Sequence, residues 1–341
     1  MDHSIDIGTK KALVVLRVPI ETLSQRGKAI ELKDCECIGI KISEQVNGES
    51  ISKELEEIFT NAGAPEAIIK DCDYTLEKGV RAWSEKQNLT VPVIEDIGHV
   101  MANSLKKQFE KTKAYTRFVS LVNKASQCLR QTDLAFLIPP KLRQKGRFQS
   151  ISKLGNWAEK LLDVLAVKGR VKKESLLFRL RKVLPDFAQS RAFIECFANT
   201  TKIVSQIMKL VKTLGLDKQS HQRCCELSDE LPGNSKVKKR LKQWLQKHFE
   251  IQQKIAPSLP LLVSSDIIES LFGRFKYMIE RSPQADMNRM ALLIPVLCGE
   301  LDQMKILQAL SQVPHNELKE WEQKNIPYTL RKKRRAFLAN K

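Results

Sequence analysis

The chain has 341 residues, with 58 Lys and Arg against 39 Asp and Glu, and its formal net charge is +19. Its 42% of hydrophobic residues supply a core, which excludes a chain disordered along its whole length. The length predicts one core with an insertion. Such a positive charge favours a polyanionic partner, above all nucleic acid, because each cation that neutralises a phosphate releases a counterion.

Membrane and secreted proteins are the classes that the sequence excludes. No run of about 18 apolar residues is present. The opening MDHSIDIGTKK lacks the pattern of a signal peptide. Neither Cys35-x-Cys37 nor Cys224-Cys225 has the CxxC spacing of a zinc site, which predicts reduced thiols. We therefore expect a cytoplasmic protein without a membrane partner, associated with the nucleoid if it is bacterial.

Strands and helices alternate in the first hundred residues. KALVVLRVPI (11–20) and CECIGIKIS (35–43) have strand character and predict a hairpin with a long loop. Further on we expect, in order, a helix at 51–63 ending on Gly63, a strand at 66–71, a helix at 76–88, a strand at 91–96 and a helix from 99. With a strand around Asp2, this order predicts a mixed sheet in a helix-rich α/β fold, α+β by content.

Helical patterns and cationic stretches dominate the residues that follow. No convincing strand is seen from about 100 to 260, and SSDIIESLFGRFKYMIE (264–280) is a further helix with Ser264 or Ser265 as its N-cap. The stretch RKKRR (331–335) is either a solvated terminus or an arm that contacts phosphates. We expect four parts: 1–100, a basic helical insertion at 101–260, closing helices at 261–313, and a basic tail at 314–341.

Three carboxylates are candidates for chemistry. Asp2 lies in the first strand, Asp71 ends the strand after the first helix, and Glu269 lies on a helix beyond the helical block. Such a set can hold two Mg²⁺ ions about 4 Å apart, which suits attack on a phosphodiester. The structural alternatives are an exposed Asp2, an Asp71 that caps the following turn, and a Glu269 on the solvated face of an amphipathic helix.

Five segments of the chain resemble, in order, landmarks of DDE-type insertion-sequence transposases. They are MDHSIDIGTKKALVVLRV, IIKDCDYTLEKGV (68–80), VPVIEDIGHVMANSLKKQFEK (91–111), GRFQSISKLGNWAEKLL (146–162) and SSDIIESLFGRFKYMIE. The resemblance covers nearly the whole chain at the level of pattern. It implies an RNase H-like mixed sheet flanked by helices and interrupted by a large all-helical insertion before the helix with the catalytic Glu.

The resemblance also assigns residues. It makes Asp2, Asp71 and Glu269 the ligands of two Mg²⁺ or Mn²⁺ ions, with Asp6, Asp73 and Asp266 as the next candidates. Six residues separate Glu269 from Lys276, the Glu-to-Lys gap of the Tyr-Arg-Glu-Lys signature of one transposase group, although Ser265 stands where its Arg would be. Both side chains then lie on one helix face, and Lys276 is expected to contact a DNA phosphate.

Several other residues have expected supporting roles. Asp96 and His99 form an Asp-x-x-His pair that the family often shows, although Asp96 could instead cap the helix after it. Compact positive charge makes Arg143, Lys145 and Arg147 our expected phosphate contacts. The spacing of Trp157 with Leu161 favours a core position over stacking on an unpaired base.

These features predict a DDE transposase catalytic domain that cuts a DNA strand at an element's end and joins it to target DNA, as a homo-oligomer when bound to DNA. Members usually carry a helix-turn-helix segment before the first catalytic strand, and only Met1 precedes Asp2 here. We therefore expect the downstream part of a longer or interrupted reading frame. The alternatives are an inactive remnant that only binds DNA, and a purely helical nucleic-acid-binding protein without a sheet.

Overall fold

A computed structural model of the chain describes residues 1–7, 10–24, 29–71, 73–141, 148, 151–281, 289–300 and 302–339. The chain divides into two compact units. The first combines Met1–Asp96 with Ile251–Lys341, and the second is Ile97–Glu250. At a coarse level the fold is helix-rich, with small sheets of mixed α/β character.

The first unit contains an antiparallel sheet of three strands in the order β1-β2-β3. The strands are β1 (Asp2–Ile7), β2 (Lys10–Arg17) and β3 (Glu36–Ser43). The expected pairing of residues 11–20 with 35–43 is confirmed, with Val14 opposite Ile40 and a register shift between Val15 and Leu16. This pairing contradicts the alternative of a purely helical protein. The link between β2 and β3, expected to be a loop, contains α1 (Ile20–Ser24) and a short 3-10 helix at Leu32–Asp34.

A parallel pair of strands follows, formed by β4 (Ile68–Lys70) and β5 (Val93–Glu95). The helix before it, α2 (Gly48–Ala62), starts at Asn47, whose side chain accepts a hydrogen bond from Ser50 N, and ends at Gly63. Gly63 has φ +82°, the left-handed conformation for which glycine is favoured at a helix end. α3 (Tyr74–Lys86) makes the crossover between the parallel strands.

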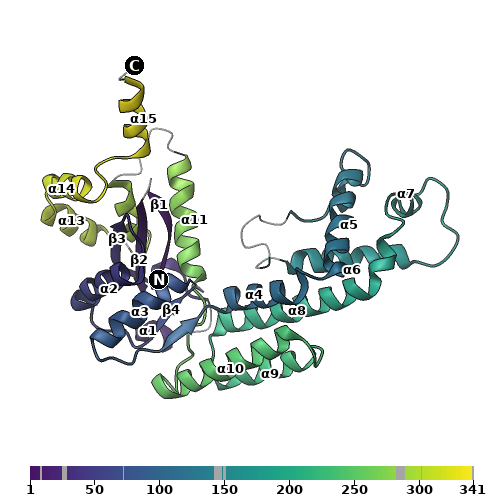
Figure 1. The fold of residues 1–341 in the computed structure, drawn as a ribbon, viewed down its shortest axis with the longest axis horizontal. Helices are drawn as coiled ribbons and strands as arrows, with labels where there is room; N and C mark the ends of the chain where they lie inside the picture. The colour runs from purple at the N-terminus through teal and green to yellow at the C-terminus, as the bar shows by residue number, and fades with distance from the viewer. Residues whose placement is uncertain are drawn as a thin grey trace. The chain divides into compact units, whose positions relative to one another are not determined.

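The central strand β2 is covered on both faces. Successive side chains of a strand point to opposite sides, so Leu13 and Val15 pack with α2 and α3, whereas Ala12 and Val14 pack with α11 (Asp266–Glu280). Figure 1 shows α11 along one face of the sheet. Burial on both faces explains why β2 reads as a continuous apolar run rather than an alternating one.

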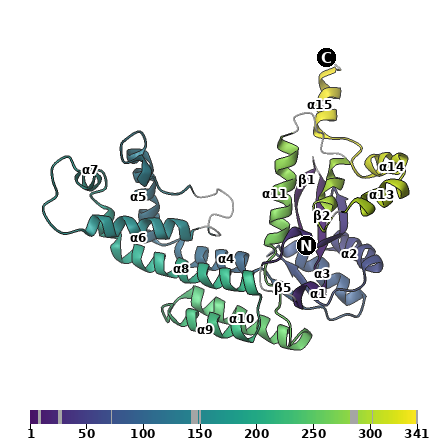
Figure 2. The ribbon, with the colours of Figure 1, turned by 180° about the vertical axis from the view of Figure 1, so that it is seen from behind.

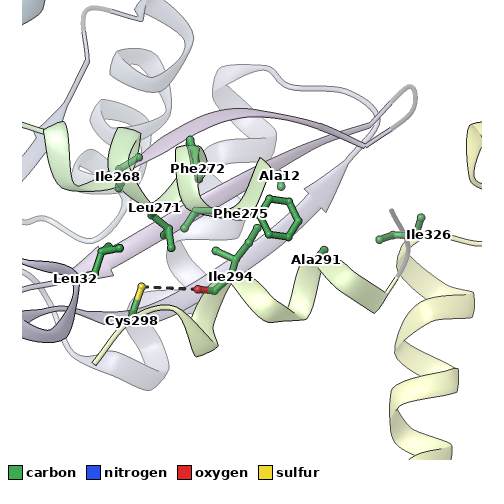
Figure 3. Close-up of a cluster of buried hydrophobic side chains, with 11 residues drawn as sticks. Ala12, Leu32, Ile268, Leu271, Phe272, Phe275, Ala291, Ile294, Cys298 and Ile326 are labelled. Atoms are coloured by element: carbon green, nitrogen blue, oxygen red, sulfur yellow. Dashed lines mark hydrogen bonds between the residues drawn. The ribbon is translucent and has the colours of Figure 1, made fainter. Parts of the chain in front are cut away.

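The core beside α11 also includes residues near the end of the chain. Figure 3 shows Ile268, Leu271, Phe272 and Phe275 of α11 directed into this cluster, together with Ile326. The elements after α11 are a 3-10 helix at Arg289–Leu292, α12 (Leu293–Val296), α13 (Gln303–Gln312), α14 (His315–Asn325) and α15 (Leu330–Ala339). The expected tail at 314–341 therefore contains two helices, and its Ile326 is 1% exposed because it completes the core.

Helices make up the second unit wherever the structure describes an element in it. They are α4 (Ile97–Phe109), α5 (Lys113–Leu129), α6 (Ser152–Ala166), α7 (Leu176–Val183), α8 (Arg191–Leu214), α9 (Lys218–Asp229) and α10 (Lys236–Ile255), which continues past the boundary, with 3-10 helices at Ala135–Leu137 and Phe187–Ser190. Figure 2 shows α4 and α6 along the long helix α8. The core of the second unit contains a cluster of aromatic rings, those of Phe109, Tyr115, Phe118, Phe193 and Phe197. Among the described helices of the whole chain, none is long and apolar enough to cross a bilayer.

Candidate active site

The start of β1 lies against β4. The Met1 ammonium donates a hydrogen bond of 2.9 Å to the Ile69 carbonyl, which joins the edge of the three-stranded sheet to the parallel pair. Burial lowers the pKa of this ammonium to about 6, while the carboxylates of Asp2, Asp71 and Asp96 each act to raise it. Asp2 itself is 8% exposed. Asp2, Asp71 and Asp96 therefore all lie near enough to this ammonium to act on it electrostatically.

Asp71 follows β4 and shapes the turn into α3. Its Oδ1 accepts a hydrogen bond of 2.9 Å from Asp73 N. Asp73 is the N-cap of α3, with its own Oδ1 accepting from Thr75 N at 2.7 Å and Leu76 N at 3.0 Å. Asp71 therefore caps the turn, as the structural alternative predicts, and the Asp73 carboxylate caps the N-terminal end of α3.

Lys70 is a neighbour of this site that the sequence reasoning missed. Its side chain is 3% exposed, and its Nζ donates to the Asp71 carbonyl at 3.2 Å and to the Glu77 carboxylate at 3.4 Å. A buried lysine needs such partners, because leaving water costs the charged form several kcal/mol. The available signal was a cation at the end of an otherwise apolar strand, EAIIKD.

Asp96 connects the end of β5 to the start of α11. It is 1% exposed, and its Oδ2 accepts from Ser265 N at 2.6 Å, Ser265 Oγ at 3.0 Å and Ser264 Oγ at 3.2 Å. Its backbone N–H bonds the Lys70 carbonyl at 3.3 Å, which also ties it to β4. These side-chain bonds reach the N-terminal end of α11, a helix far along the chain from Asp96. Of the two expected N-caps, Ser265 occupies the N-cap position without a side-chain capping bond, whereas Ser264 Oγ accepts a hydrogen bond of 3.2 Å from Asp266 N.

Glu269 and Lys276 both lie on the exposed side of α11. Glu269 is in the first turn of this helix, next to the end that Asp96 holds. Ile268 and Phe275 face the core, so the seven-residue spacing leaves both charged side chains on the solvent side, about 10 Å apart along the axis. Glu269 and Lys276 therefore both lie on the solvated face of an amphipathic helix, as the structural alternative predicts.

The described side chains do not assemble a metal centre. Among the residues that the structure describes, no three or more His, Cys, Asp or Glu side chains are arranged to hold a metal ion. Glu269 thus does not complete a ligand set with Asp2 and Asp71 in this arrangement. The pair of Mg²⁺ or Mn²⁺ ions on Asp2, Asp71 and Glu269 stays a prediction.

The remaining candidates have various positions. His99 is half-buried in α4, which belongs to the second unit. Asp266 is the exposed first residue of α11. The side chain of Asp6 lies outside the described residues, as do Arg143, Lys145 and Arg147.

Trp157 has a structural role, as its spacing predicted. Its Nε1 donates a hydrogen bond of 2.9 Å to the Leu137 carbonyl. Its ring packs edge-on against Phe187, with ring centroids 5.7 Å apart. These contacts occupy the indole and leave stacking on a base without support.

No protein-family model matches the chain, and no curated protein is detectably similar to it in sequence.

Proposed function

We propose that the first unit is the catalytic core of a DDE transposase, acting on transposon ends and target DNA. The observation that carries the proposal is that Asp2, Asp71 and Asp96 all act on the ammonium at the junction of β1 and β4, together with the bond from Asp96 to the helix that bears Glu269. The net charge of +19 supports a DNA substrate, because it attracts phosphates from a distance.

The order of elements supports an RNase H-like core within this proposal. Three antiparallel strands meet a parallel pair through the Met1–Ile69 hydrogen bond, and helices cover the sheet. The helical unit Ile97–Glu250 interrupts the chain between Asp96 and α11. A transposase with a helical insertion ahead of its catalytic Glu would have this order, and we assign the insertion to backbone contacts with DNA.

The proposed roles are specific. Asp2, Asp71 and Glu269 would be the ligands of Mg²⁺ or Mn²⁺, which in such enzymes activates the attacking oxygen. Lys276 would contact a phosphate, and Asp96 positions α11. Because the described side chains do not form a three-ligand set, we derive no step through the metal.

That same observation favours a second candidate function. A protein that keeps the fold and the positive charge, but not the metal centre, would bind DNA without cutting it. The two candidates differ in one measurable property, which is divalent-dependent strand cleavage.

The deciding experiment is a nicking assay on supercoiled plasmid with Mn²⁺, Mg²⁺ or EDTA. The catalytic proposal expects nicking with Mn²⁺ that EDTA abolishes, and a loss of at least about 100-fold for Asp71→Asn and Glu269→Gln. Glu280→Gln is the matched control, since it removes the same charge from the exposed far end of the same helix. Its rate should equal that of the unaltered chain.

The outcomes separate the candidates. DNA binding without any Mn²⁺-dependent nicking supports the binding-only protein and overturns the catalytic proposal. Nicking that survives both Asp71→Asn and Glu269→Gln would contradict the assigned site. An absence of DNA binding at low salt would reject both functions.

A further inference from the structure

The helix α15 carries the densest positive charge among the described helices. Five consecutive residues, Arg331 to Arg335, are cationic, and α15 contains no acidic residue. Its two neighbours differ, because Lys305 of α13 pairs with the N-cap residue Asp302, and the cations of α14 alternate with Glu317, Glu320 and Glu322. The positive field of α15 is therefore not cancelled by acidic residues within its own helix.

The start of α15 is fixed to the first unit, whereas its body is exposed. Thr329 is 4% exposed, its Oγ1 accepts from Lys332 N at 3.2 Å, and its carbonyl accepts from Lys333 N at 3.0 Å. Residues 331–339 are all exposed. An ion pair joins Lys332 to Glu322 at 3.3 Å. For Lys333, Arg334 and Arg335, the described part of the chain offers no ion pair.

The distribution of charge around the helix indicates the shape of the partner. Each residue of an α-helix turns by about 100°, so five consecutive cations surround the whole circumference. A flat anionic membrane contacts only one face and requires an apolar stripe along the helix. The exposed apolar residues of α15, Phe337 and Leu338, are instead adjacent at one end. Phosphates on two sides match this ring of charge better than a plane.

Duplex DNA presents phosphates in that way. Its major groove is about 12 Å wide, which admits a helix of about 10–12 Å in diameter with one phosphate strand on each side. We propose that α15 is a DNA-contacting helix that lies in a groove of the duplex and contacts phosphates of both strands. The inference deepens the proposed function, on which it rests for the choice of DNA as the polyanion.

The test is the salt dependence of binding to a duplex of about 30 base pairs, measured by fluorescence anisotropy in EDTA from about 50 to 200 mM NaCl. The variant combines Lys333→Gln, Arg334→Gln and Arg335→Gln, which keep good helix propensity. Each lost phosphate contact lowers the slope of log K against log salt by about 0.9, so the slope should fall by about 2.7. Between about 50 and 200 mM NaCl, the fold-loss of affinity in the variant should therefore be about 40 times smaller than in the unaltered chain.

A matched control removes three charges from the neighbouring helices. Lys305→Gln, Lys319→Gln and Lys324→Gln alter exposed cations on α13 and α14, where acidic residues already balance the field. The control should change the slope by less than about 1. Circular dichroism checks that both variants fold.

Each outcome bears on the inference. An unchanged slope in the α15 variant, or an equal change in the control, overturns the role of α15 in DNA binding. The nicking assay still tests the proposed function separately. Tighter binding to vesicles of equal parts phosphatidylglycerol and phosphatidylcholine than to duplex, lost in the α15 variant, assigns the helix to membranes and also overturns it. A slope reduced only in the α15 variant supports it even where no nicking occurs, and a chain that binds no duplex refutes both.

Discussion

Replacing Asp96 tests whether one buried carboxylate holds α11 on the sheet. Three hydrogen bonds to its side chain end on the same oxygen, Oδ2, and two of the donors belong to Ser265, which is 7% exposed. Asp96→Ala removes the charged acceptor and leaves these donors buried without it. Hydrogen bonds to a charged group contribute about 1.5–3 kcal/mol, and an unsatisfied buried donor costs about 1–3 kcal/mol, so we expect a loss of about 3 kcal/mol.

The conservative variant sharpens the prediction. Asp96→Asn can turn its carbonyl oxygen toward the Oδ2 position and keep the acceptor without the charge, which should cost about 1 kcal/mol. Asp302→Ala is the control, because exposed Asp302 caps α13, where its Oδ1 accepts a hydrogen bond of 2.7 Å from Lys305 N. A cap of this kind contributes about 1 kcal/mol or less.

Urea unfolding at pH 7, followed by circular dichroism, gives these differences. With a slope near 3 kcal/mol per molar urea, Asp96→Ala should lower the midpoint by about 1 M, and the other two variants by about a third of that. The reasoning fails if Asp96→Ala costs no more than Asp302→Ala. It also fails if Asn is as damaging as Ala, because the effect would then not come from the acceptor at Oδ2.

Three further predictions concern packing, thiols and the second unit. Gly79→Ala should lower the free energy of unfolding by about 1–3 kcal/mol, because a Cβ at this position would overlap the Ile51 side chain. Gly273→Ala should raise the free energy of unfolding by about 0.5–1 kcal/mol, because a Cβ there would meet nothing within 4 Å. The urea midpoints of the two variants should therefore move in opposite directions. Burial raises the pKa of Cys35, Cys224 and Cys298 to about 12, so the folded chain keeps thiol protons that the unfolded chain loses from about pH 9. The free energy of unfolding should therefore fall as the pH rises above about 9, and it should fall less steeply in Cys224→Ala. In the native protein a thiol reagent should label exposed Cys128 and Cys196 before the buried Cys35, Cys224 and Cys298, and early labelling of Cys224 would contradict the burial argument. Trp157→Phe should cost about 1 kcal/mol through the lost bond to the Leu137 carbonyl, and a thermal midpoint equal to that of the unaltered chain would show that this bond contributes nothing.

Local patterns were enough to predict the elements around the candidate site. Gly63 predicted the end of α2, and the apolar runs before Asp71 and Asp96 predicted β4 and β5. These signals succeed because periodicity and end residues depend on a few neighbours in sequence. The gathering of acids at strand ends was also open to prediction, since parallel strands bring their carboxyl ends to one edge.

The sequence by itself determined the order of helices and strands, the basic charge and the acidic residues at the strand ends. Tertiary structure alone decided that Asp96 bonds Ser265, that Lys70 is buried beside Asp71, and that Ile326 completes the core. It also left Glu269 on the exposed side of α11. The physical reason is that a buried polar group must find a partner wherever packing brings one, and packing joins residues whose separation along the chain leaves no local pattern.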